Sequence, residues 1–209
     1  MKQFIYIALM ATSLTAFGQE WNMAPMEKNN ENEKSAFDVK QEYIRLYLTA
    51  PGSFGDNVLA KANKGKIGAG LMVTFFSFSQ KHHICGGIDF AAYTVEDVSL
   101  AGNVEQSNIS NFYLAYMYRM PLGKKMSLNP KISVGSITID QRKDGDSYGK
   151  QQGVGYGAGM DIDYAFTEHT RIFLGLNYTL LKPETHTIPE LESFYDTLHQ
   201  LNITFGVKF

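Results

Sequence analysis

The chain has 209 residues, enough for one domain, and its formal net charge of −2 gives no basic field that would favour nucleic acid. Glycine (19), phenylalanine (14) and tyrosine (12) are plentiful, and the single cysteine, Cys85, excludes an internal disulfide bond. After the N-terminal stretch no apolar run reaches the ~18 residues that a membrane helix needs, so any span would have to be made by β-strands.

The N-terminus has the pattern of a cleaved signal peptide over residues 1–18. Lys2 is positive, residues 4–17 are mostly apolar, and Ala16 and Gly18 are small residues placed for cleavage. The polar stretch 19–40 predicts a flexible periplasmic segment, although Trp21 could instead dock it on a surface or in a barrel mouth. Residues 41–209 are predicted to be the folded domain.

Eight segments of this domain alternate apolar and polar residues with the period of two that β-strands have. In chain order they cover residues 43–48, 67–76, 84–93, 111–119, 128–139, 153–166, 171–181 and 199–209. The fifth changes phase at Gly135-Ser136, which predicts a β-bulge. In the sixth, Gly155, Gly157 and Gly159 are predicted to leave room for Met72 and Phe76 across the barrel.

The connections alternate strictly between short and long. Residues 79–82, 121–125 and 167–170 are short, whereas 50–65, 95–108, 140–151 and 182–196 are long and polar. This order predicts an all-β fold, an eight-stranded antiparallel up-and-down barrel, with the long loops at one end and both termini at the other.

Alternation alone does not say which face is outside, because a soluble, lipocalin-like barrel would bury the apolar face. Large apolar residues fill one face, more than eight strands can enclose, and glycine is frequent on the other. The loop asymmetry and the aromatic residues near strand ends are also typical of membrane barrels. We therefore predict a transmembrane β-barrel with the apolar face towards lipid.

The chain resembles the small eight-stranded outer-membrane barrels of the OmpX and OmpA-barrel type, and also the outer-membrane β-barrel domain proteins of Bacteroidetes-like bacteria. The resemblance covers residues 41–209 and includes a terminal strand, "ITFGVKF", that ends on Phe209. It implies a Gram-negative outer-membrane location, termini in the periplasm, and Phe209 as a signal for the barrel assembly machinery. The segment 19–40 departs from the family pattern.

The polar face carries charged residues that a membrane barrel would point into its lumen. They are Arg45, Asp89, Arg119, Lys131, Asp161, Asp163 and Lys208. A lumen of eight strands is filled by side chains, so a paired polar plug is predicted, with an Arg or Lys partner for at least two of the three carboxylates. The alternative is a charged constriction of a narrow, porin-like channel for ions or small solutes.

Other chemical motifs are weak. Residues 153–158 fit the dinucleotide fingerprint, but a loop precedes them and no helix follows. The neighbours His82, His83 and Cys85, and the pairs Glu184/His186 and Asp144/Asp146, do not form a recognised metal pattern, so neither metal nor cofactor is predicted.

The predicted function is a non-enzymatic structural or surface-binding one. Outer-membrane lipids are the expected partners, and the loops, which contain Tyr148, Phe194 and Tyr195, could contact an extracellular protein or glycan. A lipid A-modifying enzyme is a further alternative, with Ser110 and His186 as candidate catalytic residues. The strand motif His-x-Ser of lipid A deacylases is absent from "RIFLGLNYTLL".

Overall fold

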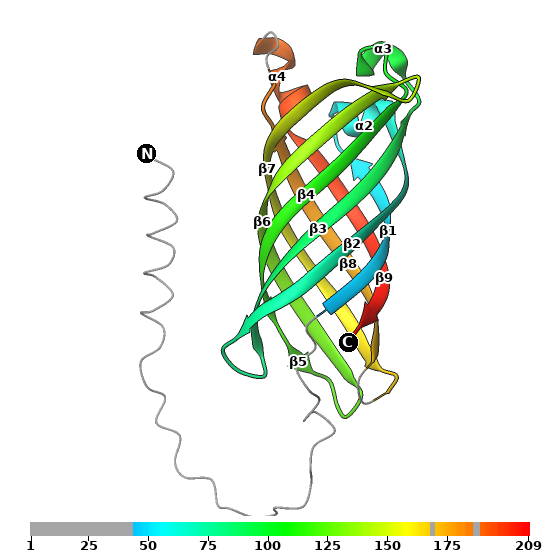
Figure 1. The fold of residues 1–209 in the computed structure, drawn as a ribbon. Helices are drawn as coiled ribbons and strands as arrows, with labels where there is room; N and C mark the ends of the chain where they lie inside the picture. The colour runs from blue at the N-terminus through cyan, green and yellow to red at the C-terminus, as the bar shows by residue number, and fades with distance from the viewer. Residues whose placement is uncertain (1–43, 168–169, 186–188) are drawn as a thin grey trace, which may run out of the picture. The chain divides into compact units, whose positions relative to one another are not determined.

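The computed structural model describes residues 44–167, 170–185 and 189–209, which form a closed antiparallel barrel (Figure 1). The predicted signal peptide, the segment 19–40 with Trp21, and His186 lie outside the described residues. A search of the described part found no helix with the length and apolar character that crossing a membrane requires.

Eight long strands and one short one build the barrel. They are β1 (Ile44–Phe54), β2 (Asn63–Ser77), β3 (His82–Val95), β4 (Gln106–Tyr118), β5 (Met120–Pro121), β6 (Met126–Lys143), β7 (Asp146–Ala165), β8 (Arg171–Pro183) and β9 (Leu198–Lys208). The long strands pair with their neighbours in sequence, and β1 pairs with β9 from Arg45↔Lys208 to Phe54↔His199. This pairing closes the sheet, so no long strand has an open edge.

The connections at one end of the barrel carry three short helices (Figure 1). These are α2 (Val58–Ala62) after β1, α3 (Val98–Ala101) after β3 and α4 (Pro189–Asp196) after β8. Asn57 begins α2, because its side-chain oxygen accepts a hydrogen bond from the Ala60 N–H at 3.0 Å. We call this the loop end. The opposite end, with the short connections, is the turn end.

The prediction of a long loop over 140–151 is wrong. β6 and β7 continue through that stretch and are joined by Asp144 and Gly145 alone, whose φ angles are 52° and 86°. Two consecutive positive φ angles match a type I′ hairpin turn, for which Asp-Gly is a preferred sequence. The loop end is therefore built from three helical connections and one tight hairpin.

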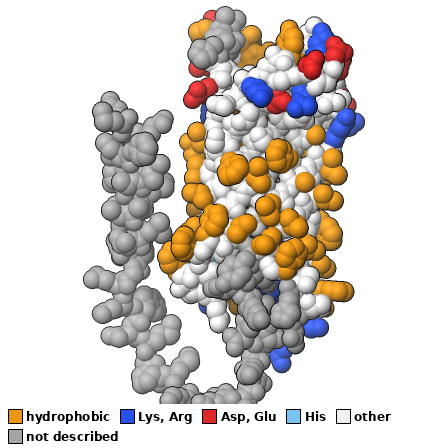
Figure 2. Space-filling model, viewed as in Figure 1, with side chains coloured by type: hydrophobic (Ala, Val, Ile, Leu, Met, Phe, Trp, Pro, Cys, Tyr) orange, Lys and Arg blue, Asp and Glu red, His pale blue; other side chains and the backbone are white. Residues whose placement is uncertain are grey.

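The apolar face of the barrel lies outside, as the sequence predicted. Exposed fractions of 57 to 69% are found for Phe112, Leu114, Ile132, Phe205 and Leu174, all on one face of their strands. Hydrophobic side chains cover the wall of the barrel below the charged loop end (Figure 2). Residues 153–158, which fit the dinucleotide fingerprint, are the middle of β7.

The predicted β-bulge at Gly135-Ser136 is wrong. β6 pairs without a shift with both β4 and β7 through these residues, and Ile137, which is 0% exposed, simply points inward. Observed register shifts lie elsewhere, between Gly65 and Gly68, between Thr74 and Phe76, and between Gln141 and Arg142.

The shift in β2 also overturns the predicted packing of Phe76 against the β7 glycines. Phe76 is 67% exposed, and Met72, although buried, packs in a cluster with Cys85 and Tyr113. The glycines make room for nearer neighbours, because a Cβ on Gly157 would lie 2.2 Å from Ser133 Oγ. They accommodate side chains of adjacent strands rather than of the opposite wall.

Candidate functional site

The centre of the turn-end lumen is an ion-pair cluster around Asp161 on β7. Arg45 Nη1, from β1, donates to Asp161 Oδ2 at 2.9 Å, and Lys131 Nζ, from β6, lies 3.3 Å from Oδ1. Asp161 is 0% exposed and Arg45 is 4% exposed. The first strand thus meets the hairpin of β6 and β7 inside the barrel through one carboxylate, which compensates a buried and a partly buried cation.

A second ion pair lies beside the first and involves Asp163 and Lys208. Lys208 Nζ, from β9, donates to Asp163 Oδ1, and Ser127 Oγ donates to the other carboxylate oxygen at 3.3 Å. The ammonium also lies 4.8 Å from the ring centroid of Phe173, a cation–π contact. Two of the three lumen carboxylates therefore have Arg or Lys partners, as the alternation predicted.

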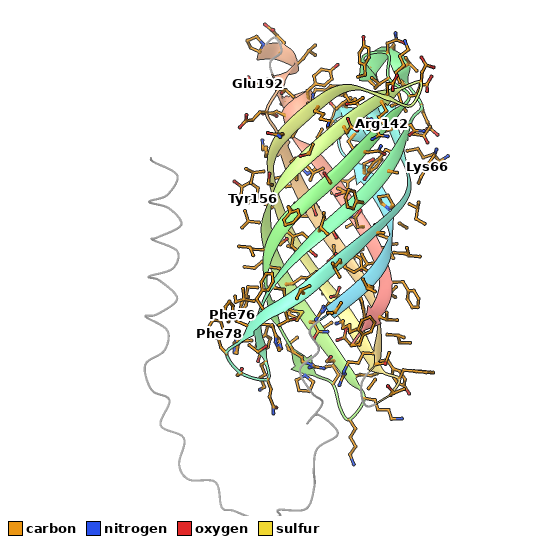
Figure 3. The ribbon with its side chains drawn as sticks, viewed as in Figure 1. Lys66, Phe76, Phe78, Arg142, Tyr156 and Glu192 are labelled. Carbon is orange, nitrogen blue, oxygen red and sulfur yellow. The ribbon has the colours of Figure 1, made fainter. Side chains whose placement is uncertain are left out.

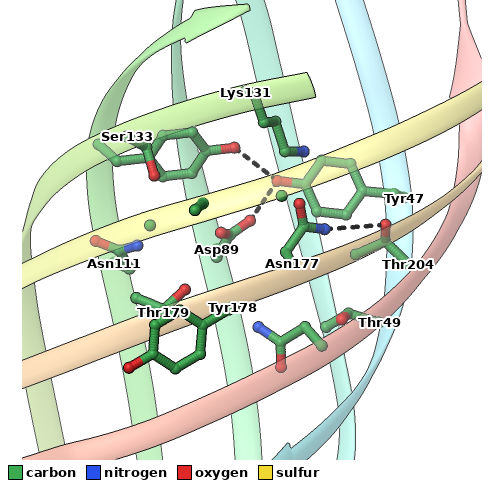
Figure 4. Close-up of a pocket in the computed structure, with 15 residues that line it drawn as sticks. Tyr47, Thr49, Asp89, Asn111, Lys131, Ser133, Asn177, Tyr178, Thr179 and Thr204 are labelled. Carbon is green, nitrogen blue, oxygen red and sulfur yellow. Dashed lines mark hydrogen bonds between the residues drawn. The ribbon is translucent and has the colours of Figure 1, made fainter. Parts of the chain in front are cut away.

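The third carboxylate, Asp89 on β3, is bound by a tyrosine. The Tyr47 hydroxyl donates to Asp89 Oδ1 and lies 2.9 Å from the Tyr113 hydroxyl (Figure 4). Lys131 lines the same part of the lumen. These side chains, together with Asn177 and Thr204, which share a 3.2 Å hydrogen bond, cross the lumen from several strands.

The open space left in this part of the lumen is small. The cavity lined by Tyr47, Asp89, Lys131 and Asn177 has a volume of about 30 Å³ for the centres of water molecules. A site of this size and polarity accommodates one or a few waters hydrogen-bonded to the side chains. The paired charges and tyrosines thus occupy most of the cross-section at this level.

The lumen changes character towards the loop end, where apolar side chains fill it. The cluster consists of Leu59, Ala91, Tyr93, Ile109, Ile137, Ile139, Leu181 and Leu198. Leu59 comes from α2, so this helix closes the mouth of the barrel from within the loop end. Within this group Gln200 Nε2 donates to the Tyr93 hydroxyl at 2.9 Å. We call this group the apolar cap.

The sequence located most, but not all, of the lumen residues. Arg119, which was predicted with the others, follows β4 at the turn end, where its backbone N–H donates to the Lys81 carbonyl at 2.7 Å. Arg171 was not included in the predicted network, although it is 1% exposed and pairs in register with Lys208. Arg171 lies on the inward face of the segment 171–181, and this position in the alternation would have assigned it to the lumen. Tyr47 and Tyr113 also lie on inward faces.

The loop end presents aromatic side chains outside the barrel. The Tyr195 hydroxyl on α4 donates to the Leu100 carbonyl on α3 at 3.1 Å, which joins two of the connections. The rings of Phe194 and Tyr195 pack edge to face with centroids 5.0 Å apart, and Tyr148 is 63% exposed. This surface offers rigid aromatic groups for contact with a partner.

The weaker candidates of the sequence are dispersed. His83 faces inward and shares a 2.8 Å hydrogen bond with Ser77, whereas His82 faces outward and shares one of 2.6 Å with Tyr116. Within the described ranges, no three His, Cys, Asp or Glu residues are grouped so that they could hold a metal ion. Ser110 faces outward on β4, and its hydroxyl lies 3.5 Å from the Thr138 carbonyl.

A closed barrel of eight long antiparallel strands, apolar outside and charged inside, defines an outer-membrane barrel. The family model of the outer membrane protein beta-barrel domain matches residues 31–209, and the chain belongs to this family. This membership and the fold place the protein in the outer membrane. No curated protein matches the chain.

The solved structures that the chain is similar to have low sequence identity to it. The crystal structure of Neisserial surface protein A is 12% identical, with a TM-score of 0.60 over 79% of this chain and 94% of that one. The outer membrane protein OprG from Pseudomonas aeruginosa is 13% identical (TM-score 0.47; 80% and 94% covered). The outer membrane enzyme PagL is 10% identical (TM-score 0.44; 78% and 97% covered). At these identities the similarity concerns the fold.

Proposed function

We propose that the protein is a structural or surface-binding outer-membrane barrel whose lumen does not conduct, with the loop end facing the cell exterior. The filling of the lumen carries this proposal. Ion pairs and tyrosines occupy the turn-end half, and the apolar cap occupies the loop-end half, with Leu59 of α2 in its mouth. An apolar layer of this kind opposes the passage of ions, because ions lose hydration in it.

Any recognition is assigned to the loop end. Its aromatic residues Tyr148, Phe194 and Tyr195 and the first-turn carboxylates Glu190 and Glu192 suit a protein or glycan ligand. Binding to bacterial and host-type glycans or to surface proteins would be screened with the folded protein and with a Tyr148→Ser/Phe194→Ser variant. Loss of binding in the variant supports this assignment, and equal binding contradicts it.

A narrow channel is the alternative that the charged cluster around Asp161 favours. Planar-bilayer recording of the purified, folded protein separates the two functions, and no openings are expected for the wild type. A Tyr113→Ala/Ile137→Ala variant, which removes side chains from both layers, serves as a control for detecting conductance. Regular, ion-selective openings of the wild-type protein would overturn the proposal of a closed lumen.

An enzymatic role in lipid A modification has less support. Ser110 faces the exterior of the barrel, as such a nucleophile would, but its described surroundings contain Thr138, Asp140 and Arg142 and no histidine. Mass spectra of lipid A from cells with and without the protein test this role. We expect an unchanged acyl pattern. The loss or gain of an acyl chain would support an enzymatic role.

Phe209 is proposed to be the assembly signal read by the barrel assembly machinery. It is 47% exposed, and its backbone exchanges hydrogen bonds of 3.0 and 3.1 Å with Ile44, so the ring stands on the outer face where β9 meets β1. A Phe209→Ala variant should reach the membrane in reduced amount but unfold normally once assembled. Normal assembly of the variant would contradict the proposal that Phe209 is an assembly signal.

A further inference from the structure

One wall of the barrel has a groove where the apolar exterior ends. The wall comprises β1, β2, β3, β4, β6 and β7, and the groove has a volume of about 680 Å³. Its turn-end side is lined by Leu48, Ala69 and Phe90, and its loop-end side by Ile67, Asn108, Asp140 and Lys150. The same wall faces the viewer in Figure 2, where charged side chains gather above the hydrophobic ones.

The strand register shows how steeply polarity changes along this wall. In register from β3 to β4 to β6, one row reads Gly86–Leu114–Val134, the next Ile88–Phe112–Ser136, then Phe90–Ser110–Thr138, and finally Ala92–Asn108–Asp140. The next residue in the last row, on β7, is Lys150. Six residues along β3 thus lead from a purely apolar row to a charged one, over roughly 20 Å.

A second groove, lined mainly by apolar residues, lies beside the first towards the turn end. Its volume is about 430 Å³, and it is lined by Leu71, Val73, Phe75, Gly86, Leu114 and Val134 among others. Both grooves exist because small residues interrupt the large ones. Gly86 has no side chain, and Ala69, Ala92 and Ser110 have short ones. A chain of methylene groups fits such a furrow.

The charges at the loop-end side favour an anion. Arg142 Nε donates to Asp140 Oδ2 at 2.8 Å, and Ser147 Oγ donates to Asp140 Oδ1 at 2.6 Å, so both oxygens of the single carboxylate in the groove are engaged. Asp140 therefore orients the guanidinium of Arg142, whose side chain is 45% exposed. Lys150 is exposed and lies opposite Asp140 in the register with β7.

Lys66 adds a third cation near this row. The register shift between Gly65 and Gly68 turns both Lys66 and Ile67 outward, at the level of Ala92 on β3. Figure 3 shows Lys66 and Arg142 near the loop end of the barrel, with Lys66 extending away from the wall. These three cations outnumber the two nearby carboxylates, Asp140 in the groove and Glu105 beside Arg142, so this boundary has a net positive charge.

We propose that this wall binds a phosphorylated glycolipid of the surrounding leaflet. Arg142 and Lys150 bind the phosphate, because charge-assisted hydrogen bonds to cations are the strong ones. Asn108, Ser110 and Thr138 meet the sugar hydroxyls, and an acyl chain runs along the apolar groove. A glycolipid fits better than a phospholipid because Ser110 and Thr138 lie between the cations and the apolar groove, and Asn108 lies in the row of Lys150.

A second copy of the chain is a poorer occupant, because a two-fold contact at this boundary would bring Arg142 and Lys150 against their own copies. The lipid site does not depend on the ligand assigned to the loops. The identity of the leaflet depends on the orientation proposed above, whereas binding in detergent does not. If only the orientation is wrong, the lipid still binds in detergent; if the site is absent, it does not.

The test uses the full chain, folded in zwitterionic detergent, and native mass spectrometry of bound lipid. The probes are bisphosphorylated lipid A, its dephosphorylated form and phosphatidylethanolamine. We expect retention of the phosphorylated glycolipid, and an affinity at least about tenfold lower in an Arg142→Gln/Lys150→Gln variant. The matched control, Lys124→Gln/Lys125→Gln, removes two exposed lysines at the turn end and should bind as the wild type does.

A second variant tests the shape of the site rather than its charge. Thr138→Trp fills the first groove from an outward position, so the barrel should still show its heat-dependent gel shift but lose the glycolipid. Equal retention of the dephosphorylated form, equal retention of phosphatidylethanolamine, or equal weakening in the turn-end control would each overturn the proposal. A dimer that dissociates in the Thr138→Trp variant without any lipid effect would also overturn it.

Discussion

The two halves of the barrel are filled by opposite chemistry. Near the turn end the interior holds Asp161, Arg45 and Lys208, and the exterior presents apolar residues such as Leu174. Near the loop end the interior holds Ile137 and the rest of the apolar cap, and the exterior of β4, β6 and β7 carries polar and charged residues such as Asp140 and Lys150. On these strands the alternation continues throughout. Towards the loop end the inward face changes from polar to apolar, and the outward face changes from apolar to polar.

This exchange follows from the solvent outside the wall. A face that meets lipid must be apolar, and the inward residues are then free to be polar if they pair with one another. Beyond the lipid the wall meets water, and the interior becomes an ordinary hydrophobic core. The turn-end half is organised as a membrane barrel, and the loop-end half as a water-soluble one. The two halves should therefore respond to different kinds of substitution.

The largest effect is expected from removing charge in the turn-end half. Asp161→Asn leaves the buried Arg45 and the partly buried Lys131 without their carboxylate, which should cost about 3–5 kcal/mol of unfolding free energy. Equilibrium unfolding in urea, in lipid vesicles, measures this loss. Asp140→Asn is the matched control, since its partner Arg142 is 45% exposed, and should cost less than about 1 kcal/mol. Equal losses would mean that water screens the lumen charges and that the two halves do not differ as proposed.

Shortening a buried apolar side chain should lower the free energy of unfolding most in the loop-end half. Ile137→Ala removes a 0% exposed side chain from the apolar cap and should cost about 2–5 kcal/mol. Leu191→Ala shortens a side chain on α4, outside the barrel wall, that is 43% exposed, and should change stability by only about 0.5 kcal/mol. The same unfolding assay compares them. If both variants lose equal stability, the cap is not a hydrophobic core.

Where the two halves meet, the close approach of neighbouring strands, rather than side-chain polarity, should decide which substitutions lower stability. A Cβ on Gly135 would lie 2.4 Å from the Phe112 carbonyl oxygen and 2.7 Å from Tyr113 Cβ. Gly135→Ala should therefore cost about 1–3 kcal/mol through overpacking. The neighbouring outward change Ser136→Ala should be silent in the same measurement. A silent Gly135→Ala would show that β4 and β6 can move apart.

The sequence predicted the strands and their outward face well, because period-two alternation is a local property of consecutive residues. The prediction failed where the inward face of a strand changes from polar to apolar residues. Ile137 and Ile139 were interpreted as a phase slip, since an apolar inward residue was not expected in a polar lumen. The Asp144-Gly145 hairpin was hidden by flanking polar residues, which the strands carry because they leave the lipid there. Distances such as that between Arg45 and Asp161, 116 residues apart, depend on barrel closure, which no local pattern specifies.

The smallest effect tests how the loop-end half is closed. Asn57 is 1% exposed, accepts from the Ala60 N–H and donates to the Phe54 carbonyl at 2.8 Å, so Asn57→Ala should cost about 1 kcal/mol. Asp97→Ala, which removes the exposed cap of α3, should cost less, because α3 buries only Ala101. Limited proteolysis at the loop end, followed by mass spectrometry, detects both changes before global unfolding does. If Asn57→Ala leaves α2 protected while Leu59→Ala exposes it, packing into the apolar cap, and not the helix cap, holds the mouth of the barrel closed.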